Sequence, residues 1–190
     1  IHSKSKTKNG GHQVLKRNTP DAHTVFAVDL EGKKLWERKF ETIISNHGGG
    51  VSPIFYGDRV ILAGDEESRS FLTALDAASG NVLWKTDRAN VKTAFSTPCR
   101  FVDPSGTEGL LFNSMAHGIT FVDPSTGKTF WEQVDLFDKR TVSSCLVADG
   151  LVIGTCGSGG SGSGGSGGSG GQEQKVQAEA ERRGKEGGGG

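Results

Sequence analysis

The cysteines are the side chains best suited to covalent or metal chemistry in this sequence, but their spacing does not form a recognisable site. Cys99, Cys145 and Cys156 are three in number and include no C-x-x-C pair. Such a set is typical of neither a disulfide framework nor a zinc site. We therefore expect all three to be buried in strands, where a thiol behaves as a small hydrophobic group.

Acidic side chains and one histidine could bind a ligand at the ends of expected strands. The run Asp65, Glu66, Glu67 could offer oxygens to calcium. That ion takes about 6 to 8 oxygens from a shaped loop, so a solvated hairpin tip is favoured. Asn46 and His47 precede three glycines in the connection that enters a repeat. They are the residues that could face a ligand, with a capped turn as the alternative.

Basic residues in the connections give weaker signals. Arg88 and Lys92, with Arg140 at the corresponding place further along, could form an anion-binding rim or remain solvated charges. His117 lies at an expected turn, and without a paired serine or cysteine nucleophile it does not build a catalytic triad. We assign no catalytic residue, no metal ligand and no cofactor to this chain.

The elements that carry these side chains are short strands. From Thr24 onward, apolar runs such as RVILAGD, FLTALDA and GITFVDP are separated by clusters of Gly, Asp, Asn and Ser. Runs of this length, rich in Val, Ile, Phe and Thr and bounded by turn residues, predict β-strands. No helical period interrupts them, so the expected fold class is all-β.

One turn occurs three times, as AVDLEGKKLW (27–36), ALDAASGNVLW (74–84) and FVDPSTGKTFW (121–131), with its aspartates 47 residues apart. The aspartate can accept hydrogen bonds from turn amides, glycine supplies a positive φ, and the large tryptophan suits burial against a neighbouring repeat. The three copies contribute Asp29, Gly32 and Trp36; Asp76, Gly80 and Trp84; and Asp123, Gly127 and Trp131.

A second landmark shares this period. VSPIF (51–55), STPCR (96–100) and VSSCL (142–146) align, which places Cys99 and Cys145 at the repeat position of Ile54 and supports a buried role for both. Each unit then runs through about four strands, with Gly-Asp or Asp-Gly hairpin turns suited to positive φ. Four antiparallel strands recurring every 40 to 50 residues or so indicate the blades of a β-propeller.

At these turns the sequence resembles the pyrroloquinoline-quinone-like (quinoprotein-type) β-propeller repeat family, whose blade motif is approximately A-x-D-x-x-[ST]-G-x-x-x-W. Residues 74–84 match it in full, residues 121–131 match with Phe121 at the alanine position, and residues 27–36 match with a one-residue deletion. The resemblance covers about residues 24–156. It implies a partial propeller of about three blades, because family propellers close with more.

The resemblance implies two functions of different class. One is a non-catalytic scaffold that binds a protein or ligand. The other is a fragment of a pyrroloquinoline-quinone-dependent dehydrogenase, in which the quinone and Ca²⁺ lie on the propeller axis. The family's dehydrogenases carry two adjacent cysteines over the quinone, and no two cysteines are adjacent here. The scaffold is therefore favoured, and we expect no enzymatic activity.

The remaining expectations concern the chain ends and the surroundings. Residues 1–22 are expected to be irregular, with a broken-off strand as the alternative, residues 23–156 to hold the repeats, and residues 157–190 to be a flexible Gly/Ser linker and polar tail.

The 22 basic and 22 acidic residues balance, so no net field attracts nucleic acid. No apolar run is long enough for a transmembrane helix, and no signal peptide is recognisable. The resemblance implies a secreted or periplasmic fragment whose partners are other blades or another protein.

Overall fold

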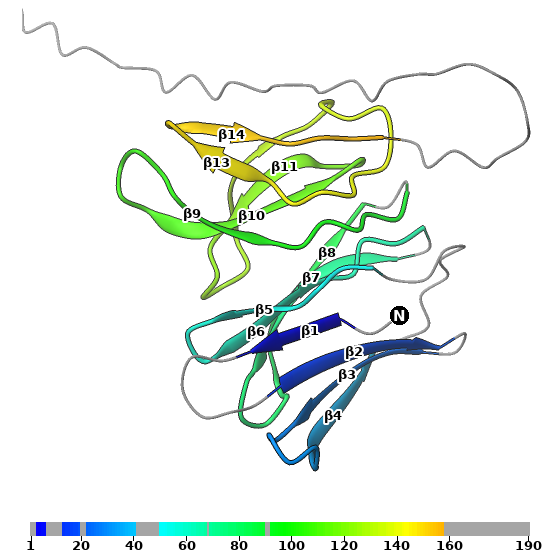
Figure 1. Ribbon diagram of the computed structural model, residues 1–190. Coiled ribbons are helices and arrows are strands. Elements are labelled where there is room, and N and C mark those ends of the chain that lie inside the picture. The colour runs from blue at the N-terminus through cyan, green and yellow to red at the C-terminus, as the bar shows by residue number, and fades with distance from the viewer. Residues whose placement is uncertain are drawn as a thin grey trace, which may run out of the picture.

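The protein is an array of antiparallel sheets. The computed structural model describes residues 3–6, 13–19, 22–40, 50–67, 69–89 and 92–157. Figure 1 shows the sheets following one another in chain order, from β1–β4 at one end to β13 and β14 at the other. Every described element is a strand, and no helix long and apolar enough to cross a membrane occurs in these residues. The predicted all-β fold of four-stranded blades is confirmed.

Three four-stranded units and one hairpin make up the array. Blade 1 contains β1 (Ser3–Lys6), β2 (Gln13–Thr19), β3 (Ala22–Val28) and β4 (Lys34–Phe40). Blade 2 contains β5 (Ile54–Tyr56), β6 (Arg59–Ala63), β7 (Ser70–Asp76) and β8 (Val82–Arg88). Blade 3 contains β9 (Cys99–Val102), β10 (Glu108–Ser114), β11 (Gly118–Val122) and β12 (Thr129–Gln133). The last hairpin contains β13 (Leu146–Ala148) and β14 (Leu151–Ile153).

The N-terminal segment corrects one expectation. Residues 1–22 are expected to be irregular, with a broken-off strand as the alternative; β1 and β2 lie there, and β2 pairs along its whole length with β3. The β2 sequence QVLKRNT has only two apolar residues, so its hydrophobic alternation is too weak to predict a strand. Pairing with the apolar strand β3 supplies the backbone hydrogen bonds instead, and blade 1 is a complete sheet.

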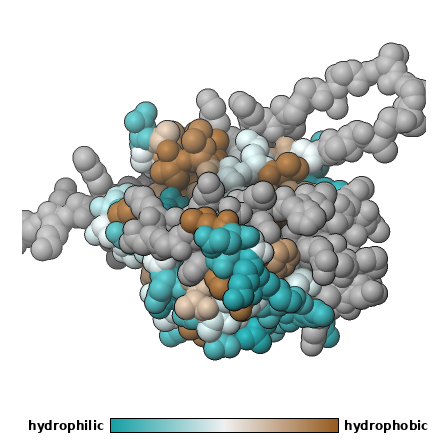
Figure 2. All heavy atoms as spheres, turned by 60° about the horizontal axis from the view of Figure 1, so that its bottom comes forward, coloured by the Kyte–Doolittle hydropathy of each residue, from teal (hydrophilic) through white to brown (hydrophobic). Residues whose placement is uncertain are grey.

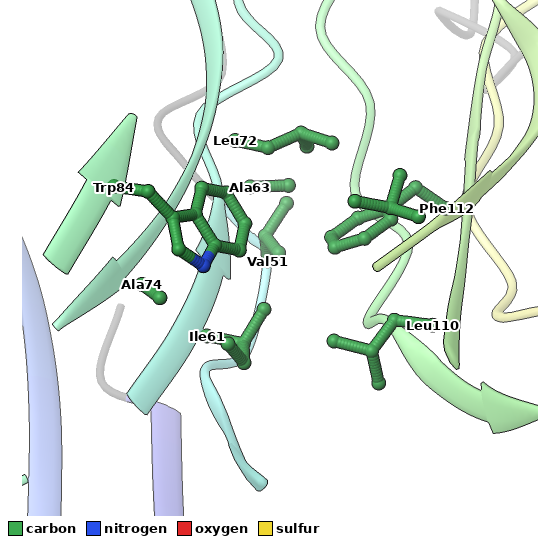
Figure 3. Packing of buried hydrophobic residues seen from close by; sticks show 9 residues of the cluster. Val51, Ile61, Ala63, Leu72, Ala74, Trp84, Leu110 and Phe112 are labelled. Atoms are coloured by element: carbon green, nitrogen blue, oxygen red, sulfur yellow. The ribbon is translucent and has the colours of Figure 1, made fainter. Parts of the chain in front are cut away.

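The hydrophobic core lies between the sheets. Successive strand residues point to opposite faces, so in β6 Val60 packs toward blade 1 while Ile61 packs toward blade 3. Figure 3 shows Ile61 and Trp84 of blade 2 facing Leu110 and Phe112 of blade 3. Strands covered on both faces are apolar throughout rather than alternating, which explains runs such as RVILA.

In blades 2 and 3 the first strand pairs with the second in the same way. In blade 2, Ile54 pairs with Ile61. In blade 3, Cys99 pairs with Leu111. Ile61 and Leu111 both belong to the cluster that their blade shares with the next unit. Ile54 and Cys99 therefore occupy the same repeat position and face the next unit.

The last hairpin departs from this pattern by one residue. Val152 packs back against blade 3, so its neighbour Ile153 and the strand partner Leu146 face away from blade 3. Cys145 precedes Leu146, and consecutive residues point to opposite faces. The expectation that Cys145 shares the repeat position of Cys99 is therefore wrong by one residue. Cys99 faces the last hairpin, whereas Cys145 is buried facing blade 3.

Candidate functional site: the seams between blades

A tryptophan from the outer strand closes each of the first two seams. Trp36 of β4 donates its indole N–H to the carbonyl of Ala77 in blade 2, at 3.0 Å. Trp84 of β8 donates in the same way to the carbonyl of Pro124 in blade 3, also at 3.0 Å. Both tryptophans are 9% exposed, so each buries its apolar ring and satisfies its one polar group. The seam is a repeated joint in which one blade docks a tryptophan on the turn of the next.

The turn glycine receives the face of this tryptophan. Gly80 and Gly127 have φ angles of 72° and 75°, a conformation that residues with a Cβ resist. A Cβ at Gly80 would lie 2.5 Å from Cε3 of Trp36, and a Cβ at Gly127 would lie 2.5 Å from Cε3 of Trp84. Gly32 has a φ of 87°, but no atom lies within 4 Å of the position that its Cβ would take. At the two closed seams glycine is therefore required both for conformation and for packing.

The turn aspartate holds the same loop through its carboxylate. Asp76 accepts hydrogen bonds from the hydroxyl of Ser79 at 2.6 Å and from its amide at 2.7 Å. These bonds stabilise the charged carboxylate and lower the pKa of Asp76. For Asp123, burial acts to raise the pKa, but hydrogen bonds from Thr126 and Ser125 outweigh burial and the pKa is lowered.

Blade 1 has a shorter turn that uses its aspartate similarly. Asp29 accepts a hydrogen bond from the amide of Lys33 at 2.7 Å. Its backbone carbonyl also accepts a bond from the amide of Gly32 at 3.2 Å. The one-residue deletion therefore preserves the carboxylate-to-amide contact within the turn.

A second donor, two residues after each tryptophan, reinforces the seam. Nε of Arg38 donates to the carbonyl of Gly80 at 2.9 Å, and the hydroxyl of Thr86 donates to the carbonyl of Gly127 at 3.1 Å. The donors differ in chemical type but share a place in the repeat. Neither residue stands out in the sequence, and only this shared position could have indicated the role.

A buried ion pair within blade 2 lies at the seam with blade 3. Nε of Arg88, at the end of β8, lies 3.5 Å from Oδ1 of Asp65, and both side chains are 4% exposed. The same guanidinium donates to the hydroxyls of Ser114 at 3.1 Å and Thr120 at 3.2 Å. Glu66 is also buried, at 1% exposed. The expected solvated hairpin tip and the expected solvated arginine are both corrected, because these side chains are buried and Arg88 contacts blade 3.

The polar contacts continue across blade 3. The hydroxyl of Thr120 donates to Oε1 of Glu132 at 3.0 Å, and Nδ1 of His117 lies 2.9 Å from the same oxygen. In the connection before the last hairpin, a guanidinium nitrogen of Arg140 lies 3.8 Å from Oε1 of Glu67. Arg140 therefore faces a carboxylate instead of contributing to an anion-binding rim.

The remaining candidates from the sequence are Asn46, His47 and Lys92. Asn46 and His47 lie outside the described residues, as does the predicted tail from residue 158 onward. Lys92 is exposed. In the part of the chain that the structure describes, no group of three or more His, Cys, Asp and Glu side chains is placed to hold a metal ion.

The blades and their tryptophan-on-glycine seams define a β-propeller built from pyrroloquinoline-quinone-like repeats. A family model described as "Outer membrane protein assembly factor BamB" matches residues 20–185. The chain therefore belongs to this family.

Solved structures are similar to this chain. BamB from Moraxella catarrhalis aligns with a TM-score of 0.56 and 17% identity, over 81% of this chain and 43% of that one. A Bacteroides caccae protein of unknown function aligns with a TM-score of 0.49 and 15% identity, over 82% of this chain and 52% of that one. A europium-containing methanol dehydrogenase aligns with a TM-score of 0.49 and 17% identity, over 79% of this chain and 37% of that one. This chain thus spans about half or less of each relative's length, and no curated protein matches it.

Proposed function

We propose that this chain is a non-catalytic segment of a larger β-propeller and that it serves as a protein-binding scaffold. The proposal rests on the observation that the charged side chains of the blades have structural roles. Asp76 and Asp123 hold the repeat turns, Arg88 pairs with buried Asp65, and Glu132 accepts hydrogen bonds within blade 3. Groups used in this way stabilise the frame, which leaves the outer surface of the blades as the part that meets other molecules.

The outer strands present an apolar side chain to solvent at the same repeat position. Leu35, Leu83 and Phe130, here called the rim set, each precede a seam tryptophan and are 44%, 46% and 47% exposed. Single exposed apolar residues are common on proteins, but this position repeats in three blades. On the face seen in Figure 2, apolar groups are separated by hydrophilic ones. A regular series of apolar contacts set in a polar surface suits docking of another protein.

The last hairpin supports a larger propeller. Ile153 is only partly buried at the repeat position where Ile61 of blade 2 is fully buried, and its strand partner Leu146 is 60% exposed. Trp131, the third repeat tryptophan, is only partly buried, in contrast to Trp84. A further blade carrying the same turn would cover these side chains in the way that blade 3 covers Trp84.

The proposed location and partner class rest on the family. Its description names outer membrane protein assembly, and one structural relative is BamB itself. We propose a secreted or periplasmic location on this basis. A protein partner is also consistent with the balance of 22 basic and 22 acidic residues, which gives no attraction for nucleic acid.

Site-specific photocrosslinking in the producing cells tests the scaffold role. A benzoylphenylalanine is placed at Leu83 or Phe130 of the rim set, or at Val102 as the matched control, because Val102 is an apolar residue of inner strand β9 that is 57% exposed. The proposal predicts that both rim positions crosslink to the same protein and that Val102 does not. Equal crosslinking at Val102, or no adduct at either rim position, would contradict it.

A further inference from the structure

The inner connections of blade 3 and the last hairpin run side by side. The amide of Phe95 donates to the carbonyl of Thr141 at 2.9 Å. Phe95 lies four residues before Cys99, and Thr141 lies four residues before Cys145. The two backbones are therefore within hydrogen-bond distance just before each reaches its cysteine.

The two thiols then meet across this seam. Cys99 pairs with Leu111, which belongs to the cluster between blade 3 and the last hairpin, and Cys145 is buried in the same cluster. The Cys99 and Cys145 thiols are close enough to shift each other's pKa in opposite directions. Cys156 also packs against this cluster, but its Sγ lies 3.5 Å from Oδ1 of Asp138. The geometry thus selects one cysteine pair among the three residues.

We propose that Cys99 and Cys145 form a disulfide that locks blade 3 to the last hairpin under oxidising conditions and opens on reduction. The two side chains face each other only because Cys145 is shifted by one residue from the repeat position of Cys99. At the same repeat position both side chains would point toward the next unit. This redox site is independent of the proposed scaffold function.

The two thiols have different roles in forming the bond. Interaction with the Cys145 thiol lowers the pKa of the Cys99 thiol, whereas interaction with Cys99, together with burial, raises the pKa of Cys145. Cys99 is also the less buried of the two. A thiolate is the attacking species in disulfide exchange, so Cys99 reacts first and Cys145 completes the bond.

The exchange balances with a small-molecule disulfide as the oxidant. The Cys99 thiolate attacks one sulfur of oxidised glutathione, which forms a mixed disulfide and releases one glutathione thiolate. Cys145 then loses its proton to solvent and attacks the sulfur of Cys99, which releases the second glutathione. Two electrons pass from the protein thiols to oxidised glutathione, and two molecules of reduced glutathione leave.

Peptide mapping of the oxidised chain identifies the bond. The purified protein is incubated with oxidised glutathione at about pH 8, where thiolates form readily, and free thiols are then alkylated. Digestion with trypsin and Asp-N releases Cys99 in TAFSTPCR (93–100) and Cys145 in TVSSCLVA (141–148). Cleavage before Asp149 places Cys156 in a separate peptide.

The proposal predicts that TAFSTPCR and TVSSCLVA are joined in the wild type and in Cys156→Ser, but not in Cys99→Ser. Closing a loop of this length is expected to raise the melting temperature by about 5 to 15 °C over the reduced protein. A stable glutathione adduct on Cys99 without the link, or a link that involves Cys156, would overturn the pairing. A correct link without a rise in melting temperature would overturn the locking role.

Discussion

Replacing Gly127 by alanine tests the two requirements that the repeat turn places on its glycine. Gly127 has a φ of 75°, and a Cβ there would lie 2.5 Å from Cε3 of Trp84 and 2.9 Å from the hydroxyl of Thr86. Gly32 holds the same place in blade 1 with a φ of 87°, and nothing lies within 4 Å of its Cβ position. Gly32→Ala is therefore a matched control that shares the backbone requirement and lacks the packing requirement.

The two requirements differ in magnitude. A left-handed conformation costs a residue with a Cβ about 1 kcal/mol, and both variants lose this amount. Forcing a methyl group into a packed contact costs about 1 to 3 kcal/mol more, and this applies at Gly127 alone. We expect Gly32→Ala to lose about 1 kcal/mol of unfolding free energy and Gly127→Ala to lose about 2 to 4 kcal/mol.

Urea unfolding, followed by circular dichroism and tryptophan fluorescence, measures both losses. The fluorescence of Gly127→Ala should also differ from wild type before unfolding, because Trp84 must move away from the new methyl group. Equal losses in the two variants, with unchanged native fluorescence, would refute the packing of Trp84 on this turn.

Three further predictions concern the same seams. Arg88→Met removes the ionic partner that lies 3.5 Å from buried Asp65, and thermal or urea unfolding should show a loss of about 3 to 5 kcal/mol; a loss below about 1 kcal/mol, the value of an exposed pair, would contradict the burial. Trp84→Ala should lower the free energy of unfolding by about 3 to 5 kcal/mol. Trp84→Phe should lower it by less, because phenylalanine retains an apolar ring. The lowered pKa values of Asp76 and Asp123 mean that the unfolded chain binds these protons more tightly than the folded one. Their contribution to stability is therefore complete above the unfolded carboxyl pKa of about 3.9 and is lost as the pH falls through the folded values. Asp123→Asn should flatten the decline of melting temperature below about pH 5, and an unchanged slope would contradict this.

The fold could be predicted from the sequence because its strongest signals are local and repeated. The turn glycines and tryptophans recur with one period, and the apolar runs between them are short and bounded by turn residues. Each copy supports the others, so the blade could be recognised although one turn is a residue shorter. The strands β1 and β2 could not be predicted in this way, because their sequences carry little apolar pattern: β2 depends on pairing with β3, and β1 pairs with β2.

The partners of charged and reactive side chains could not be predicted, because they depend on which face of a strand each residue occupies and on what covers the strand end. Asp65 and Arg88 lie near the ends of strands, a place that is normally solvated, but both side chains are buried. Cys145 aligns with Cys99 in sequence, but one additional residue before the Asp149-Gly150 turn reverses the face of its side chain. A one-residue shift of this kind changes every side-chain contact in a strand.

Titration of the purified chain with pyrroloquinoline quinone and Ca²⁺, followed by fluorescence and calorimetry, tests the proposed scaffold function most directly. The scaffold account predicts no saturable binding by a chain that shows a cooperative β-type unfolding transition. Trp84→Ala serves as the control in which a closed seam is disrupted. Saturable binding at about micromolar affinity or tighter, lost in Trp84→Ala, would contradict the account and favour a fragment of a quinone-dependent dehydrogenase.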